Sequence, residues 1–299
     1  DVQSVIGNAT PAIDRSKLPD PNGATYTRNA LTGDIGVVAN PDGAVNPFVR
    51  VGRSYRHPNL EELLFAGPAT AGSILPNVTV QPETGNNFDA GMKFRAGSFD
   101  GGAFFFYNQY QNFIAQDLVV ATNSSGPLAQ AYNFGNVRVT GVELQGAMPI
   151  TLKPGVLTVT GGASFNRGTI TEGTNPQNQK SLANTPFDNI TPSKIVVNGR
   201  FTQSRGRWWV EYGARGQGDV TRVASTLLDS PFLIAQDLLS LKGFVVQRAG
   251  AGVNLGTDRN RVGLTFAVEN LGDKFYREHF QFAPARGRTF TIGLNIGAF

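Results

Sequence analysis

Apolar and polar residues alternate along most of this chain with the two-residue period of a β-strand, from residue 33 to the end. In the segment 87–96, for example, Phe88 and Met92 fall on one face of a strand, while Asp89 and Lys93 fall on the other. The same pattern recurs in the segments 141–148, 155–166, 208–215, 261–269 and 289–296. Helical periodicity is nearly absent, so we expect an all-β chain built from long amphipathic strands.

The connections between these strands alternate in length. Read back from Phe299, the long ones are 271–286, 217–242, 168–190, 116–132 and 56–82, and the short ones are 256–259, 203–206, 152–155, 97–101 and 40–43. A soluble β-sandwich also shows alternation along its strands, but it has no reason to keep short turns at one end and long loops at the other. This layout is typical of outer-membrane barrels, with short periplasmic turns and long extracellular loops. We therefore predict an antiparallel transmembrane β-barrel.

The composition agrees with many strands joined by turns, because glycine (36) and proline (17) are frequent while charged residues make up only 16%. No stretch approaches the roughly 18 consecutive apolar residues that a membrane-spanning helix needs. The formal net charge of +4 is too small and too dispersed to indicate a nucleic-acid partner. Cysteine is absent, which excludes disulfides and thiolate metal sites.

The strand count indicates part of a barrel. We find about eleven strands, whereas bacterial barrels have an even number. The first strand, near residues 33–40, is expected to descend from an outer loop, and the last ends in the periplasm. The chain opens without a signal peptide on a stretch rich in proline, aspartate and asparagine. We expect residues 1–30 to be an extracellular loop segment of a longer chain and residues 31–299 to be the C-terminal part of the barrel.

Six short segments carry a family resemblance, and they are residues 55–63, 81–93, 105–114, 136–143, 269–277 and 287–299. The first contains Tyr55-Arg56-His57-Pro58 followed by Glu62-Leu63, and the second contains Gln81-Pro82-Glu83. The fifth, with Asn270-Leu271-Gly272-Asp273 before Tyr276, is the clearest match. In this order the six segments resemble the barrel of the TonB-dependent receptors, with a C-terminal aromatic residue at Phe299.

The resemblance implies the C-terminal half of a barrel of about 22 strands, with the plug domain absent from this chain. It also implies a bacterial outer-membrane transporter for TonB-dependent active uptake of a scarce ligand such as a siderophore–metal complex. The implied partners are the N-terminal half of the barrel and the plug, on the same or a separate chain, TonB acting through the plug, outer-membrane lipid and the barrel-assembly machinery. A passive porin-like channel and a structural outer-membrane component of a larger assembly are the alternatives.

Within such a barrel the apolar rows face lipid, where a charge at mid-bilayer costs about 2 to 4 kcal/mol. The residues expected to face the lumen are Asp89, Lys93, Arg95, Glu143, Glu211, Arg215, Arg261 and Glu269. The candidate ligand-binding residues, in an extracellular loop, are Phe275, Tyr276, Arg277, His279, Phe280, Phe282 and Arg286. These aromatic and basic groups suit stacking and anionic groups, although aromatics just beyond a strand also form interfacial girdles.

The last strand carries the expected barrel-assembly signal, formed by Phe290, Ile292, Leu294, Ile296 and Phe299. Phe299 is out of step with the other four, and a bulge near Gly297 would restore its alignment, because glycine tolerates the backbone of a bulge.

Enzyme activity has no support in the motifs. The glycine clusters at 161–162 and 250–252 lie inside strand patterns with no following helix, so they do not cradle phosphate. Neither a Gly-x-Ser-x-Gly nor a His-Glu-x-x-His segment is present. The two histidines, His57 and His279, have no recognisable partners for a catalytic or metal site. We therefore expect no catalysis, no cofactor and no resident metal.

Overall fold

The computed structural model describes residues 30–68, 72–187, 190–223, 240–256, 260–279, 281 and 283–298. Residues 1–29, nearly all of the expected extracellular loop segment, lie outside this range. One short helix and thirteen strands make up the described chain: β1 (Gly33–Val38), β2 (Val45–Arg56), α2 (Leu60–Leu64), β3 (Gly67–Pro68), β4 (Ser73–Leu75), β5 (Glu83–Ala96), β6 (Phe99–Asn123), β7 (Gly126–Leu152), β8 (Gly155–Gly173), β9 (Lys194–Gln203), β10 (Trp208–Gln217), β11 (Phe244–Gly256), β12 (Asn260–Glu269) and β13 (Thr289–Ala298).

All thirteen strands belong to one sheet. Eleven of them follow one another as antiparallel neighbours in the order β1-β2-β5-β6-β7-β8-β9-β10-β11-β12-β13, so the expected number of strands is confirmed. The two short strands β3 and β4 lie off this path, with β4 parallel to β7. Within the described residues, β1 pairs only with β2 and β13 only with β12, so the sheet is an open wall.

The apolar rows form one continuous face, because residues directly opposite each other in antiparallel strands point to the same side of the sheet. Val51 lies opposite Phe88, which lies opposite Tyr107 on the next strand. At the far end of the wall Val253 lies opposite Leu264, which lies opposite Leu294. Most of the large side chains on this face are exposed. The apolar rows therefore do not meet a second sheet, as they would in a sandwich.

Charge is confined to one end of this apolar face. In the described strands β5 to β13 its charged residues are Arg138, Arg167 and Glu172, and Arg53 lies on the same face of β2. All four lie toward the long-loop end. On β5 the apolar stretch of this face runs from Phe88 to Ala96, a length of about 26 Å at 3.3 Å per residue. This length matches the apolar band of about 25 Å on an outer-membrane barrel.

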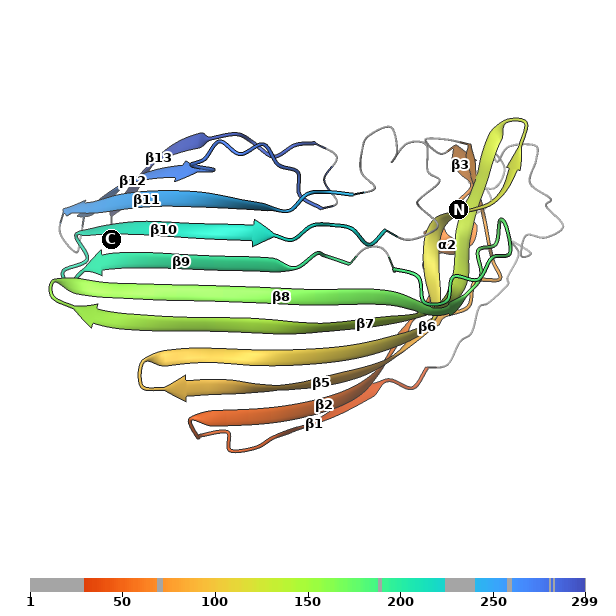
Figure 1. Cartoon of the computed structure of the whole chain (residues 1–299), viewed down its shortest axis with the longest axis horizontal. Coiled ribbons are helices and arrows are strands. Elements are labelled where there is room, and N and C mark those ends of the chain that lie inside the picture. The colour runs from red at the N-terminus through yellow and green to blue at the C-terminus, as the bar shows by residue number, and fades with distance from the viewer. Residues whose placement is uncertain are drawn as a thin grey trace.

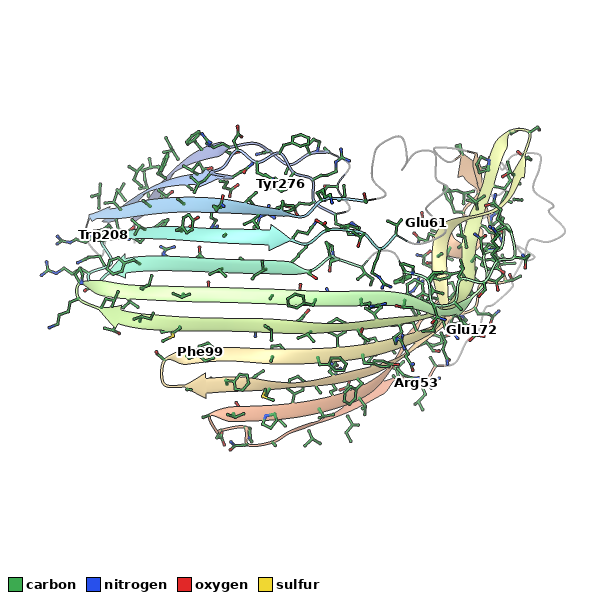
Figure 2. The ribbon with its side chains drawn as sticks, in the orientation of Figure 1. Arg53, Glu61, Phe99, Glu172, Trp208 and Tyr276 are labelled. Carbon is green, nitrogen blue, oxygen red and sulfur yellow. The ribbon has the colours of Figure 1, made fainter. Side chains whose placement is uncertain are left out.

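Short and long connections lie at opposite ends of the wall (Figure 1). The turns after β1, β5, β7 and β9 and the end of β11 lie at one end, and α2 and the described parts of the long connections lie at the other. Phe99 and Trp208 mark the short-turn end, and Arg53, Glu61 and Glu172 mark the long-loop end (Figure 2). In the described chain, no helix has the length and apolarity needed to cross a membrane.

One expected loop is wrong. Residues 116–132, which we expected to connect two strands as a loop, instead continue β6 to Asn123 and begin β7 at Gly126. The hairpin is held by pairs such as Val119 with Ala129, with register shifts between residues 110 and 121. Its base packs against α2 in a small cluster of Leu63, Val80, Ile114 and Ala131. Burial of these side chains explains why strand pairing extends through a segment rich in turn residues.

A second apolar cluster lies where β6, β7 and β8 leave the band. Its buried residues are Phe134, Val137, Ile170, Leu182 and Phe187. Phe113 packs edge-on against Phe134 and Phe187, at ring-centroid distances of 5.8 and 4.9 Å. The chain between β8 and β9 is thereby anchored onto the wall.

At the C-terminal end, β12 and β13 pair without interruption from Glu269 opposite Thr289 to Asn260 opposite Ala298. The bulge suggested near Gly297 is therefore wrong, because Arg261 lies directly opposite that glycine. Phe299 lies outside the described residues, and the barrel-assembly role of the last strand stays a prediction.

Candidate functional site

Seven of the eight charged residues expected to face the lumen occupy the face of the sheet opposite to the apolar rows. The strand register fixes this arrangement: Asp89 lies opposite Phe106, Glu143 opposite Phe104, and Arg215 opposite Val246. The eighth, Arg261, pairs with Gly297 through its backbone, and its side chain lies outside the described part of the structure. We call this surface, formed by the polar rows of β2 and β5 to β13, the polar face.

The structure brings two of these eight residues, Arg215 on β10 and Glu269 on β12, together at one hollow. A hollow of about 610 Å³ is lined by Arg215, Glu269, Tyr276 and Arg286, among others. Arg215 donates to the Tyr276 hydroxyl at 2.8 Å and forms an ion pair with Glu278 at 2.7 Å. The hollow therefore lies where the return segment between β12 and β13 meets the wall, and Tyr276 beside the wall is visible in Figure 2.

Glu211 lies on the same face, closer to the short-turn end than Arg215, and two arginines neutralise its charge. Its carboxylate contacts Arg248 at 2.9 Å and Arg200 at 3.7 Å. The Arg200 guanidinium also lies 3.9 Å from the centre of the Trp209 ring, a cation–π contact. Trp209 lies over Gly252, where an added Cβ would be 2.3 Å from its indole nitrogen. Glycine at this position therefore makes room for the ring, and the cluster is a rigid, internally paired part of the wall.

The remaining predicted lumen charges are not gathered into this region. Arg95 forms a long ion pair with Asp100, at 3.7 Å, between two exposed side chains. Asp89 lies opposite Arg50 in the register of β2 and β5, and Arg50 pairs with Asp34 at 3.0 Å. Among the described residues, Lys93 has no ion-pair partner. These charged residues are therefore spread over several strands of the polar face.

The candidate loop residues divide between the wall and the solvent. Phe275 is 77% exposed, whereas Tyr276 packs on Phe244 with ring centroids 4.2 Å apart. Burial, and secondly the charge of Lys194, lowers the pKa of His279. Phe280 and Phe282 lie outside the described residues. Of the seven candidates, Tyr276 and Arg286 line the hollow within the described residues.

The Asn270-Leu271-Gly272-Asp273 segment builds the turn that carries this lining. The Asn270 side chain is buried, donates to the carbonyls of Lys274 and Arg286, and accepts from the Lys274 amide at 2.9 Å. Asp273 accepts from the Arg288 amide at 2.7 Å. Asn270 and Asp273 both have positive φ, which asparagine and aspartate tolerate better than most residues. The motif thus fixes where the chain leaves β12 and re-enters β13.

The two N-terminal motifs meet in one ion cluster, which we call the Arg56 cluster, formed by Arg56, Glu62 and Glu83. Arg56 binds both carboxylate oxygens of Glu83, at 2.7 and 2.8 Å, and both of Glu62, at 2.9 and 3.0 Å. Glu62 also forms a capping box with Asn59 at the start of α2. Glu83 accepts from the Ile114 amide at 2.8 Å. The cluster therefore joins β2, α2, β5 and β6 at the long-loop end.

Sequence reasoning missed several polar-face residues, namely Lys194, Arg200, Gln217, Phe244 and Arg248. The strands β9 and β11 carry apolar runs on both faces, Ile195-Val196-Val197 and Phe244-Val245-Val246, which hide the period of two. Their partners β8, β10 and β12 alternate clearly, so antiparallel pairing could have revealed the register. In the described part of the chain, no group of three or more His, Asp or Glu side chains is placed to hold a metal ion.

Comparison with known proteins agrees with this geometry. The profile of the family described as TonB dependent receptor-like, beta-barrel matches residues 6–271. No curated protein matches the chain significantly by sequence. Among solved structures it is similar to the copper transporter OprC, with a TM-score of 0.64 and 20% identity over 87% of this chain and 38% of that one.

Two further structures are similar. The FrpB iron transporter from Neisseria meningitidis (F3-3 variant) has a TM-score of 0.64 and 18% identity over 89% of this chain and 39% of that one. The siderophore receptor PirA from Pseudomonas aeruginosa has a TM-score of 0.58 and 15% identity over 90% of this chain and 42% of that one. The chain thus spans less than half the length of these structures.

An antiparallel wall with an exposed apolar band on one face and charge on the other defines the class of transmembrane β-barrels. The family match then identifies the chain more closely. It belongs to the TonB-dependent receptor family and forms part of the family's β-barrel. This family consists of outer-membrane receptors and transporters and is not a family of enzymes.

Proposed function

We propose that this chain forms wall and outer loops of a bacterial outer-membrane transporter that takes up a scarce ligand, such as a metal chelate, by TonB-dependent active transport. The observation that carries the proposal is the polar face, with its paired charges and two hollows, on a wall whose opposite face is a charge-free apolar band. Similar structures are titled as iron, copper and siderophore transporters or receptors, which supports a metal-containing cargo.

In this proposal the apolar face contacts lipid and the polar face lines the lumen. Phe99 and Trp208 are exposed on the apolar face at the short-turn end, where an aromatic girdle would meet the periplasmic interface. A plug domain would fill the lumen and transmit force from TonB. The remaining barrel strands and the assembly machinery that inserts them are further partners of the same proposal.

An uptake experiment tests the proposal. Cells grown under iron or copper limitation are compared with a strain lacking the gene for this chain and a strain lacking TonB, and cellular iron and copper are measured by mass spectrometry. We expect uptake of one metal to fall to the same level in both mutants. Uptake that needs this gene but persists without TonB would refute active transport.

Conductance separates the main alternative. The purified protein is inserted into planar bilayers, and single-channel currents are recorded in potassium chloride. A plugged importer should stay closed, whereas a passive channel should conduct steadily. If neither uptake nor conductance depends on the protein, the structural role in an outer-membrane assembly remains the better description.

A further inference from the structure

One register row crosses the polar face at the level of the smaller hollow. Strand pairing places six side chains in line across β6 to β11, in the order Phe104, Glu143, Ser164, Lys194, Gln217 and Phe244. All six line a hollow of about 370 Å³. We call these residues the Glu143–Gln217 row. Its middle is polar and each of its ends is a phenylalanine.

The polar groups in this row are unusually poor in partners. Among the described residues, neither Glu143 nor Lys194 takes part in an ion pair, unlike Glu211 and Arg215 on β10. Gln217 is only 6% exposed, yet its side-chain nitrogen has no hydrogen-bond partner in the described structure. A buried amide donor without an acceptor costs about 1 to 3 kcal/mol. The row therefore holds one buried amide donor without an acceptor, in Gln217, beside the solvent-exposed ammonium of Lys194, and the solvent-exposed carboxylate of Glu143 lies at the other end of its polar part.

The spacing of these groups indicates the chemistry that would satisfy them. Lys194 and Gln217 are directly opposite each other, so two donors converge on one point. Glu143 lies two strands from Lys194, a Cα separation of about 9.6 Å at 4.8 Å per strand. A carboxylate fits between Lys194 and Gln217, and an ammonium group on the same molecule would face Glu143. This pattern selects a zwitterion over a simple anion, because Glu143 repels a second negative group.

The rings at the two ends differ in availability. Phe244 is 5% exposed and already covered by Tyr276, whereas Phe104 is half-buried and lies beside Glu143 in the row. Phe104 packs near Phe48 with ring centroids 6.0 Å apart and covers Gly102, so its position is fixed. An apolar or aromatic substituent next to the ammonium group would therefore pack on Phe104.

We propose that the Glu143–Gln217 row is a binding subsite for an amino-carboxylate group with an apolar side chain, held through its carboxylate by Lys194 and Gln217 and through its ammonium by Glu143. The inference rests on the proposed function in one respect, that the polar face lines the lumen. It adds the class of ligand group that this part of the wall recognises, whatever metal the full cargo carries.

Three matched probes test the subsite by fluorine NMR line broadening with the detergent-solubilised full protein. They are 4-fluoro-L-phenylalanine, 4-fluorophenethylamine, which lacks the carboxylate, and 3-(4-fluorophenyl)propionate, which lacks the ammonium. We expect the amino acid to bind at least tenfold more tightly than either analogue. Equal broadening of all three probes, as in empty micelles, would overturn the proposal.

Variants assign the contacts. Lys194→Met should weaken binding of the amino acid about tenfold and leave the amine unchanged, whereas Glu143→Gln should weaken the amino acid and leave the propionate unchanged. Lys93→Met is the matched control, because it removes a lysine of the same face outside the row. Retained heat-modifiable mobility on gels shows that each variant is folded. Unchanged binding in Lys194→Met contradicts the assignment.

Two outcomes distinguish the two proposals. If no probe binds to the intact protein, the row is occupied by another part of the protein or serves no ligand, and the subsite is refuted while TonB-dependent uptake can still be found. If the probes bind but metal uptake is independent of TonB, the subsite stands and active transport fails.

Discussion

Replacing Arg56 with methionine should remove most of the order at the long-loop end of β2. Methionine keeps a flexible apolar stem of similar reach but leaves Glu62 and Glu83 without their shared counter-charge. The side chains of these two glutamates are only 2% and 9% exposed, whereas that of Arg56 is 42% exposed. The change therefore converts a cluster of net charge −1 into two adjacent, poorly solvated carboxylates.

The magnitude follows from burial. Breaking a fully buried ion pair by removing one partner costs about 3 to 5 kcal/mol. Water reaches the Arg56 side of this cluster, so we expect a loss of about 2 to 4 kcal/mol in the free energy of unfolding. Arg50→Met is the matched control, because it removes another arginine of β2 whose ion pair with Asp34 is half exposed on both sides. Water screens this exposed pair, so we expect Arg50→Met to leave the free energy of unfolding almost unchanged.

The first assay is urea unfolding of the protein in lipid vesicles. The second is hydrogen exchange, measured for the amides of residues 57–66 and for the Ile114 amide. These amides depend directly on the Arg56 cluster through α2 and Glu83. We expect their protection to fall in Arg56→Met and to stay unchanged in Arg50→Met. Equal small losses in both variants would refute the reasoning, since burial would then not decide the value of the pair.

Further predictions concern the two faces of the sheet, the turn at Asn270, the glycine that lies against Trp209 and one histidine. Leu264→Lys places a charge in the middle of the apolar face and should lower the free energy of unfolding in vesicles by about 2 to 4 kcal/mol. Thr265→Lys on the polar face should lower it much less, and equal losses would contradict the assignment of the two faces. Asn270→Ala should lower the free energy of unfolding in urea by about 2 to 3 kcal/mol, because it removes three hydrogen bonds from a buried side chain at positive φ. Asn270→Gly relieves only the backbone strain, because it removes the same hydrogen bonds. Full recovery of stability in that variant would therefore exclude the hydrogen bonds as the cause. Gly252→Ala should displace the Trp209 ring, lower the free energy of unfolding by about 1 to 3 kcal/mol and change the tryptophan fluorescence. Gly263→Ala is the control, because its added Cβ meets nothing closer than 3.4 Å, and it should leave the fluorescence spectrum unchanged. The pKa of His279 should lie below 6.5 in an NMR titration and should rise in Lys194→Met. Because the folded state favours neutral His279, the contribution of this residue to stability is complete above pH 6.5 and is lost as the pH falls. A pKa above 6.5 would contradict the buried position of His279.

Much of the fold could be predicted from the sequence because a barrel wall has a simple local rule. Each strand has one face toward lipid and one toward water, so apolar and polar residues alternate along it. Residues 87–96 and 261–269 obey the rule strictly, and the register places their charges on one face of the sheet. The path of about eleven antiparallel strands was predicted for this reason, whereas the family was predicted from the resemblance of six short segments.

The hairpin of β6 and β7 could not be predicted because it extends beyond the region where lipid dictates the pattern. Its tip is rich in turn residues, including Asn123 and Gly126, and such residues indicate a loop. Strand pairing there depends on cover from α2 and on the parallel neighbour β4, which local sequence does not reveal.

The ion clusters were also beyond the sequence. Arg56 and Glu83 are 27 residues apart and meet because the register of β2 and β5 sets them opposite each other. Similarly, Arg215 meets Glu278 across 63 residues through the turn built by Asn270. The motifs that contain these residues were recognisable, but their contacts required the strand order and register.

The direction of the two outermost strands limits how the wall can be completed. Eleven consecutive antiparallel neighbours leave β1 and β13 running the same way. If a second copy were placed beside the first with its long loops on the same side of the membrane, its β1 would meet β13 in parallel orientation. Antiparallel pairing would then require an inverted copy, with its long loops on the opposite side. An antiparallel ring therefore cannot arise from two equally oriented copies, and the strands that bridge β13 and β1 must be odd in number.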